Sequence, residues 1–415
     1  MSATTQSRGS SFEVPLLRRP AGIVSGTPEY LRASWALFLA GFSTFSLLYC
    51  VQPLLPTFAG HFHIGAATSA LALSLTTGAL ALAIAAAGVF SQRVSRRNLM
   101  FASMVIAAVM NLAAAAAPEW SQLLTARLLE GLALGGVPAV AMAYLAEEMH
   151  PSHLGKAMGL YVGGTAFGGM AGRVGMGLVT EFASWRGAMG ILGAIDLAAA
   201  IGFLVLLPPS RNFVIRRGFD LSHHRRIWAG HLRDTRLVRL FAIGFILTSV
   251  FVALFNFAGF RLAASPYHLG EAEISAIFLV YAFGICASSA AGGLADRFGR
   301  KGPLGVGLAV MAAGVATTLC AALPLIIAGI TLVTIGFFIA HSVASSWIGR
   351  LAGPEKSQAA ALYLLFYYLG SSTIGAAAGW FWEGAAWGGV AALTGALALL
   401  GLGLALSMPE TADHV

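Results

Sequence analysis

The sequence has little charge and few cysteines. Only 10% of its 415 residues are charged, 58% are hydrophobic, and the mean hydropathy is +0.79. A soluble core could not hide so much apolar surface, so the composition excludes a soluble globular protein and predicts an integral membrane protein. The three cysteines, Cys50, Cys286 and Cys320, lie far apart within apolar runs, which argues against a disulfide framework or a metal site.

Motifs for enzymatic or nucleotide-driven chemistry are also missing. The sequence has no G-x-x-x-x-G-K-[ST] phosphate loop, no nucleophile elbow and no zinc-binding pattern. His61 and His63 have metal-like spacing, but no cysteine or acid cluster accompanies them, so we expect solvated loop residues. We therefore predict that the protein is not an enzyme, has no catalytic residue, and binds no cofactor or metal.

The excess of positive charge follows a membrane topology. The net charge is +8, and the cations gather before the first apolar run, in one long polar connection and in alternate loops. This asymmetry is the positive-inside pattern, which indicates orientation and contact with the lipid bilayer. No patch of interleaved basic and aromatic residues occurs, so we expect no nucleic-acid partner.

Long apolar runs predict the fold class. Because a span needs about 20 mainly apolar residues, we predict an all-α membrane protein with twelve transmembrane helices. The predicted spans are residues 34–59, 67–91, 98–117, 120–146, 156–181, 186–207, 237–262, 271–295, 302–322, 324–349, 356–380 and 385–407. An even number of spans puts both termini on one side, and the arginines place that side in the cytoplasm.

An internal repeat divides the chain into two halves. Residues 292–301 read G-G-L-A-D-R-F-G-R-K and residues 88–97 read G-V-F-S-Q-R-V-S-R-R, with aligned cations 204 residues apart. Residues 161–172 and 368–379 also match, at a tyrosine and three glycines that offer a smooth face for close helix packing. An offset near half the chain length indicates that the second half is a copy of the first.

The repeat and the polar connection predict the domain order. A disordered cytoplasmic tail (1–33) precedes a six-helix bundle (34–207), a cytoplasmic linker (208–236) that could hold a short amphipathic helix, a second six-helix bundle (237–407) and a cytoplasmic tail (408–415).

Two parallel six-span halves, a basic linker and a G-x-x-x-D-R-x-G-R-K turn resemble the major facilitator superfamily. The resemblance covers about residues 35–407. More narrowly, residues 49–56 (Y-C-V-Q-P-L-L-P), 168–173 (G-G-M-A-G-R) and 340–347 (A-H-S-V-A-S-S-W) resemble the YnfM-type bacterial efflux permeases. The resemblance implies two pseudo-symmetric bundles that rock about a central site and so expose it alternately to each side.

The turn after the eighth predicted span is a candidate gate. Such charge is tolerated only at the membrane surface, and the matching acid in the family holds the cytoplasmic side closed. We expect Asp296 to pair with Arg297 or Arg300, unless the turn merely orients the two helices. In the first copy Gln92 replaces the acid, which leaves only a neutral hydrogen bond. The predicted gating residues are Asp296, Arg297, Gly299, Arg300, Lys301, Gln92, Arg93 and Arg97.

Three buried ionisable residues are candidates for proton coupling. Arg127 and Glu130 lie one helical turn apart in L-x-x-x-R-x-x-E-G, which resembles the family's second motif. A desolvated Glu130 could carry a proton, or the two residues could form a static ion pair. His341, in an apolar helix, is either a proton carrier or a packing residue held by a hydrogen bond. We predict Glu130, His341 and Arg127 as coupling residues.

Arg173 follows a glycine ladder within the fifth predicted span. An intramembrane arginine normally faces a wet cavity or a partner acid. We predict that Arg173 contacts a substrate anion, with pairing to Glu130 or a carbonyl as the alternative. Asp196, in the sixth predicted span, has no obvious partner, and we expect a peripheral hydrogen bond, for example with Asn111, rather than a place in a proton path.

Two amides at equivalent positions, Gln52 and Asn256, are 204 residues apart and are expected to line the cavity or to join helices by a hydrogen bond. The tyrosines Tyr49, Tyr363, Tyr367 and Tyr368 could add an aromatic wall to the cavity, or could simply pack at the membrane interface. The predicted substrate-binding residues are Arg173, Gln52, Asn256, Tyr49 and Tyr367.

These residues together predict a secondary active transporter of the bacterial inner membrane. We expect a monomeric multi-pass protein that uses a proton gradient to export small organic compounds, such as drugs, sugars or organic anions, by antiport. The alternatives are import or uniport of an organic anion, and a membrane sensor or lipid-handling protein that transports nothing.

Overall fold

The structure is a computed structural model that describes residues 22–90, 94–212 and 221–409. Within these ranges the regular secondary structure is helical, apart from one isolated bridge between Ile23 and Met149. This confirms the all-α prediction.

Nine α-helices and one 3-10 helix precede the linker and form what we call the first bundle. They are α1 (Pro28–Tyr49), α2 (Leu55–Phe62), α3 (Ala66–Ser69), α4 (Leu71–Phe90), α5 (Arg96–Ala116), α6 (Trp120–Leu134), α7 (Gly136–Glu148), η1 (Pro151–His153), α8 (Leu154–Phe182) and α9 (Trp185–Leu206). The predicted span 34–59 differs in two ways. It begins at Pro28, where the Thr27 side chain accepts a hydrogen bond from Tyr30 N, and it breaks before Leu55, where Pro53 cannot donate to a continuous helix.

The second bundle follows a linker helix, α10 (Leu221–Arg233), which lies inside the predicted linker. The second bundle consists of α11 (Thr235–Ala263), α12 (Glu271–Ala276), η2 (Ile277–Val280), α13 (Tyr281–Phe298), α14 (Lys301–Thr317), α15 (Leu323–Leu351), η3 (Gly353–Glu355) and α16 (Lys356–Leu406). Asp234 caps α11, and hydrogen bonds from Arg236 lower the pKa of its carboxyl.

The helix lengths are consistent with twelve membrane spans. Nine segments of the described residues are long and apolar enough to cross a bilayer. The longest of them contains α16, which is interrupted by non-helical backbone at Ala385 and Ala386 and so supplies two spans. The shorter apolar helix α14 and the 29-residue α8 complete the set.

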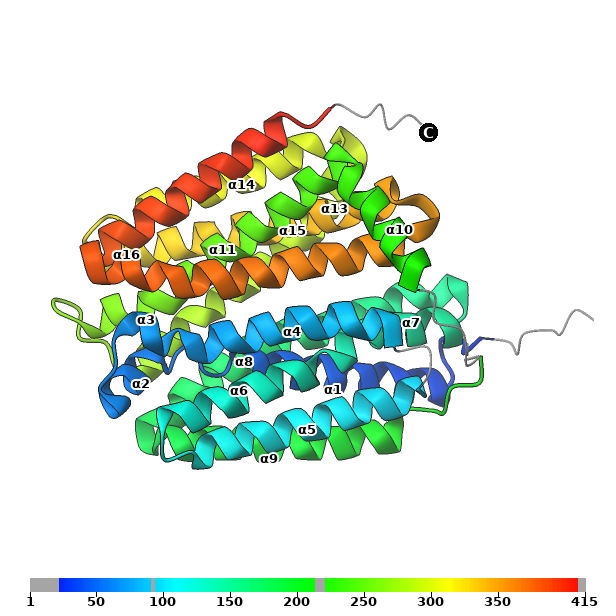
Figure 1. The fold of residues 1–415 in the computed structure, drawn as a ribbon, viewed down its shortest axis with the longest axis horizontal. Helices are drawn as coiled ribbons and strands as arrows, with labels where there is room; N and C mark the ends of the chain where they lie inside the picture. The colour runs from blue at the N-terminus through cyan, green and yellow to red at the C-terminus, as the bar shows by residue number, and fades with distance from the viewer. Residues whose placement is uncertain (1–21, 91–93, 213–220, 410–415) are drawn as a thin grey trace, which may run out of the picture.

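The two bundles lie side by side, with α4 of the first against α16 of the second (Figure 1). One end of the molecule carries α10, the start of α1, the end of α16 and the turn from Asp296 to Lys301; we call this end the linker face. The other end, which carries α2, α3 and the break in α16, we call the opposite face (Figure 1).

The predicted close packing of glycines is confirmed for Gly168 and Gly172, where α8 crosses α1, but is wrong for Gly163, where an added Cβ atom would meet nothing within 4 Å. A Cβ atom added to Gly172 would lie 2.7 Å from Ser46 Cα, and one on Gly164 or Gly168 would meet the backbone of Phe38 or Phe42. Because no side chain separates the two backbones, the next residue of α8, Arg173, reaches the last turn of α1.

Candidate functional site

Arg173 belongs to α8 and is buried, with 1% of its surface exposed. Its Nε donates to Gln52 Oε1 at 2.7 Å, and its Nη1 donates to the Gly169 carbonyl at 2.6 Å. It forms no ion pair with any described carboxylate, so the alternative pairing with Glu130 is wrong, whereas a carbonyl contact is present. The guanidinium charge therefore lacks a counter-ion among the residues described.

Aromatic rings surround this guanidinium on several sides. Its Cζ lies 4.1 Å from the ring centroid of Tyr49, 5.0 Å from that of Tyr281 and 5.1 Å from that of Phe278. Tyr49 belongs to the first bundle, whereas Phe278 in η2 and Tyr281 in α13 belong to the second. Such cation–π contacts stabilise a desolvated cation. Arg173 consequently touches both bundles at once.

The two equivalent amides meet at the bundle interface. Gln52 Nε2 donates to Asn256 Oδ1 at 2.8 Å, and both side chains are buried. Residues at matching positions of two related halves can touch only near the axis that relates the halves, so this bond marks the centre of the repeat. A cavity of about 10 Å³, room for about one water, adjoins Gln52. The helix-to-helix hydrogen bond, one of the two predicted interpretations, is therefore present.

His341 sits in an aromatic cluster of the second bundle. Its Nδ1 lies 2.8 Å from Tyr363 Oη, and its ring centroid lies 4.9 Å from that of Tyr367 and 5.6 Å from that of Phe337. Tyr367 in turn packs against the buried cluster that contains Tyr49. The histidine therefore has a hydrogen-bond partner within its own bundle, and its aromatic surroundings extend to the Arg173 site.

The predicted pair of Arg127 and Glu130 is an ion pair within the first bundle. Arg127 Nη1 and Glu130 Oε2 are 2.6 Å apart, and both side chains are 0% exposed. Three further guanidinium hydrogens are donated to the carbonyls of Leu47, Leu48 and Ala72. Glu130 Oε1 is buried without a hydrogen-bond partner among the described residues. The acid therefore has one free acceptor position in an environment without bulk water.

Asp196 is a second fully buried acid beside this ion pair. Ser46 Oγ lies 3.2 and 3.3 Å from its two carboxylate oxygens, and Asp196 interacts electrostatically with Glu130. The expected partner was wrong, because Asn111 donates instead to the Met189 carbonyl. Asp196 forms no ion pair with a described cation. The position of Asp196 inside an apolar run indicates a functional residue, but its contact with Ser46, 150 residues away, could not be predicted from the sequence.

The predicted latch acid lies on the linker face. Asp296 Oδ1 is 3.3 Å from Arg300 Nη2, which is one of the predicted partners, and 3.4 Å from Arg350 Nη2, which was not predicted. Arg297 instead lies over the ring of Phe298 at 5.1 Å. Gly299 has a φ of 77°, which favours glycine, and ends α13 before Lys301 begins α14.

The first copy of the turn is described only in part. Gln92 and Arg93 lie outside the described residues. Arg97 donates to the Leu204 carbonyl at 2.5 Å, and the neighbouring Arg96 pairs with Glu147 at 2.9 Å. Both described cations of this turn therefore make contacts within the first bundle.

Three glutamates near the opposite face join the two bundles, and sequence reasoning missed them. Glu271 accepts from Thr57 Oγ1, Glu181 Oε2 accepts from Ala272 N at 3.2 Å, and Glu383 Oε1 accepts from Ala67 N at 3.3 Å. In each case the acid belongs to one bundle and the donor to the other. We call these three residues, Glu181, Glu271 and Glu383, the glutamate bridges.

Several direct hydrogen bonds between the bundles gather in one part of the molecule. They include the three glutamate bridges, the Gln52–Asn256 bond and a 2.7 Å bond from Ser372 Oγ to the Ser74 carbonyl. All lie between the centre and the opposite face. These bonds fasten the bundles together on that side of the molecule.

Comparisons with known proteins agree with this architecture. The profile of the Major Facilitator Superfamily matches residues 37–265. The chain is 44% identical to the uncharacterized MFS-type transporter YybF of Bacillus subtilis (strain 168), covering 92% of this chain and 94% of the relative. It is 42% identical to the inner membrane transport protein YnfM of Escherichia coli (strain K12), covering 92% and 91%.

A solved structure has the same fold. The chain superimposes with a TM-score of 0.74 and 16% identity on a bacterial homolog of the human lysosomal transporter Spinster, solved in an inward-facing, unoccupied conformation, covering 92% of this chain and 97% of that one. These matches and the helical spans identify a membrane-embedded, multi-pass transporter rather than an enzyme. The chain belongs to the Major Facilitator Superfamily.

Proposed function

We propose that this protein is a proton-coupled antiporter of the bacterial inner membrane that exports small organic compounds carrying an anionic or hydroxylated group. The observation that carries the proposal is Arg173, a buried cation that touches both bundles and has no described counter-ion. Burying a charge without a partner is costly. A ligand that supplies the missing negative charge or hydrogen-bond acceptors offsets that cost, and it does so at the point where both bundles can respond.

Alternating access is supported by where the bundles are joined. The direct hydrogen bonds between them lie from the centre to the opposite face, so a rocking motion that opens this face must break the glutamate bridges and the Gln52–Asn256 bond. We assign the linker face to the cytoplasm because its turns and linker carry most of the cations. The structure is then the form that is closed toward the outside.

Proton coupling is supported by the charge count around Glu130. Two buried carboxyl groups, Glu130 and Asp196, interact with each other, and the one described cation that pairs with either of them is Arg127, so one proton makes the group of three neutral. The hydroxyl of Ser46 has one proton but faces two acceptors, the Ser43 carbonyl at 3.1 Å and the Asp196 carboxyl. A proton on Asp196 satisfies both contacts. We therefore add Asp196 to the predicted coupling residues Glu130, His341 and Arg127.

The substrate class can be tested on purified protein. A thermal-shift screen at acidic and alkaline pH, with organic anions, hydroxylated neutral compounds and organic cations, reports ligand class and proton linkage together. We expect stabilisation by anionic or hydroxylated compounds in the unaltered protein and in Arg225→Ala, a control that removes an exposed linker arginine. Arg173→Ala should lose this stabilisation. Equal stabilisation of the Arg173→Ala protein would refute the proposed ligand contact.

Direction and coupling require flux measurements in proteoliposomes. Antiport predicts that a proton gradient drives the ligand found in the screen against the direction of proton movement. Movement of the ligand together with protons would indicate import by symport, and flux that ignores the gradient would indicate uniport. A ligand that binds but never crosses the membrane would identify a sensor and contradict the transport proposal.

A further inference from the structure

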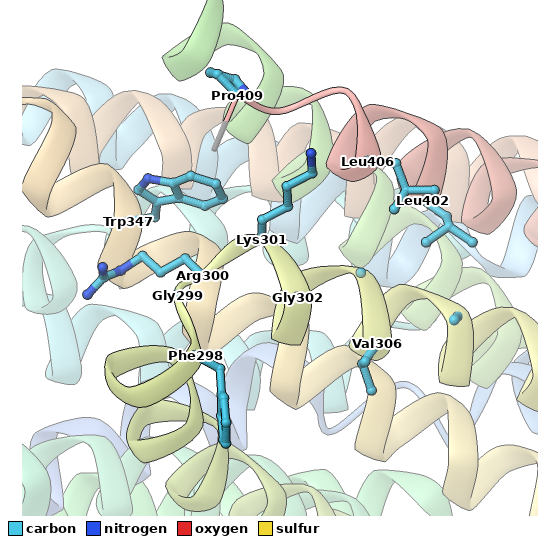
Figure 2. A pocket seen from close by; sticks show the side chains of 12 residues that line it. Phe298, Gly299, Arg300, Lys301, Gly302, Val306, Trp347, Leu402, Leu406 and Pro409 are labelled. Atoms are coloured by element: carbon cyan, nitrogen blue, oxygen red, sulfur yellow. The ribbon is translucent and has the colours of Figure 1, made fainter. Parts of the chain in front are cut away.

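We propose that the cavity beside the start of α14 binds an anionic phospholipid of the cytoplasmic leaflet. The cavity has a volume of about 700 Å³ and lies on the linker face of the second bundle. Its lining comes from the turn between α13 and α14, from α14 itself, from Trp347 of α15, and from the end of α16 (Figure 2). The proposal rests on the orientation assigned above but not on transport activity.

The rim of the cavity has the charge that a phosphate group requires. Two cations, Arg300 and Lys301, line the cavity, and Arg350 lies nearby, paired with the same acid, Asp296, as Arg300. Arg300 is held by Asp296 and is mostly buried, whereas Lys301 makes no hydrogen bond or ion pair with another described residue. Figure 2 shows the Lys301 side chain extending from the start of α14, away from Arg300. Its ammonium group is therefore available to an external anion.

The wall below this rim is apolar and faces outward. Val306 of α14 is 57% exposed and Leu406 of α16 is 60% exposed, and Ala309 and Leu402 continue the wall. From Lys301 to Ala309 the helix rises about 12 Å. A polar head beside Lys301 would thus place an acyl chain along the first turns of α14, between this helix and α16. This order of charge and then apolar surface matches a membrane lipid better than a soluble anion.

Space for the acyl chain exists because α14 carries small residues on this side. A Cβ atom on Gly302 would meet nothing within 4 Å, and one on Gly305 would only reach Leu406 and Leu402, at 3.9 and 4.0 Å. A larger side chain at Gly305 would therefore occupy the groove without disturbing the helix backbone contacts. This offers a second test that leaves every charge in place.

A lipid at this position would act on the candidate gate. The cavity is lined by Gly299 and Arg300, which belong to the same turn as Asp296. A phosphate beside Lys301 competes electrostatically with Asp296 for the neighbouring guanidinium groups. Membrane composition would thereby influence the pairing of the latch acid.

The experiment measures lipid binding by the purified full chain in neutral detergent. Native mass spectrometry compares phosphatidylglycerol with phosphatidylcholine of the same acyl chains. We expect a preference for phosphatidylglycerol that falls about fivefold in Lys301→Gln and is unchanged in Lys156→Gln, a control at an exposed lysine at the linker-face end of α8. Gly305→Leu should weaken phosphatidylglycerol binding although the charges remain.

Several results would overturn the proposal. They are an unchanged lipid preference in Lys301→Gln, equal binding of the two lipids by the unaltered protein, and undiminished binding in Gly305→Leu. Displacement of phosphatidylglycerol by inorganic phosphate at equal concentration would also overturn it, because the site would then recognise a free anion. None of these assays measures transport, so their failure is distinguishable from failure of the proposed function.

Discussion

Neutralising the two buried acids of the first bundle should have very different effects on stability. Glu130→Gln removes the only described carboxylate that pairs with Arg127, at 2.6 Å and with both side chains fully buried. Breaking a buried pair on one side typically costs about 3–5 kcal/mol. Because Arg127 keeps three carbonyl acceptors, we expect Glu130→Gln to lower the free energy of unfolding by about 3 kcal/mol, at the low end of this range.

Asp196→Asn should be mild by comparison. If Asp196 bears a proton, the exchange replaces one neutral group by another of similar size, and the contact with Ser46 can be kept. We expect Asp196→Asn to lower the free energy of unfolding by less than about 1 kcal/mol, the contribution of one neutral hydrogen bond. The free energy of unfolding in mixed detergent micelles measures both variants.

A compensating variant separates charge from packing. Arg127→Met combined with Glu130→Gln leaves no unpaired charge, so we expect it to recover at least about 2 kcal/mol relative to Glu130→Gln alone. The reasoning fails if Asp196→Asn is as costly as Glu130→Gln, since that result would show that an ionised Asp196 stabilises the fold. Equal stability of Glu130→Gln and the double variant would refute the uncompensated-charge argument.

Three further predictions concern packing and gating. Asn256→Ala removes the amide that joins the bundles. Without this hydrogen bond, the free energy that favours the closed opposite face should fall by about 1 kcal/mol, which raises the open fraction about fivefold. Labelling of cysteines introduced at that face measures the open fraction, and unchanged labelling would contradict this prediction. Gly172→Val should destabilise the protein by about 3 kcal/mol because α1 cannot retreat, whereas Gly163→Val on the same helix meets nothing within 4 Å and should be tolerated; equal unfolding midpoints would refute the packing argument. Asp296→Asn should change the accessibility of cysteines introduced at the linker face. It should lower the free energy of unfolding by less than about 1 kcal/mol, because the Asp296 side chain is 67% exposed. Identical accessibility in the variant and the unaltered protein would refute the gating role of Asp296.

Sequence reasoning succeeded where spacing along one helix, or the repeat, determines the neighbours. Arg127 and Glu130 are one helical turn apart, and any helix brings them together. Gln52 and Asn256 meet because the halves are related by symmetry and both residues lie near the axis. The glycine ladder likewise indicated a close helix contact, although not that α1 would be the partner.

The remaining contacts depend on which helices become neighbours. Asp296 pairs with Arg350, 54 residues away, and Asp196 contacts Ser46, 150 residues away. The glutamate bridges connect different bundles, and no periodicity in either bundle encodes such a contact. The break between α1 and α2 was foreseeable from Pro53, but overall hydropathy outweighed this local signal in the predicted span.

Distances between spin labels on the two faces test the rocking of the bundles most directly. One pair, at positions 156 and 356, spans the linker face, and another, at positions 63 and 264, spans the opposite face; all four residues are exposed. The measurement compares acidic with alkaline pH, with and without a ligand from the thermal-shift screen. We predict that any condition that shortens the distance across one face lengthens the distance across the other. Distances that stay fixed under all conditions, or that change in the same direction, would contradict alternating access about the Arg173 site.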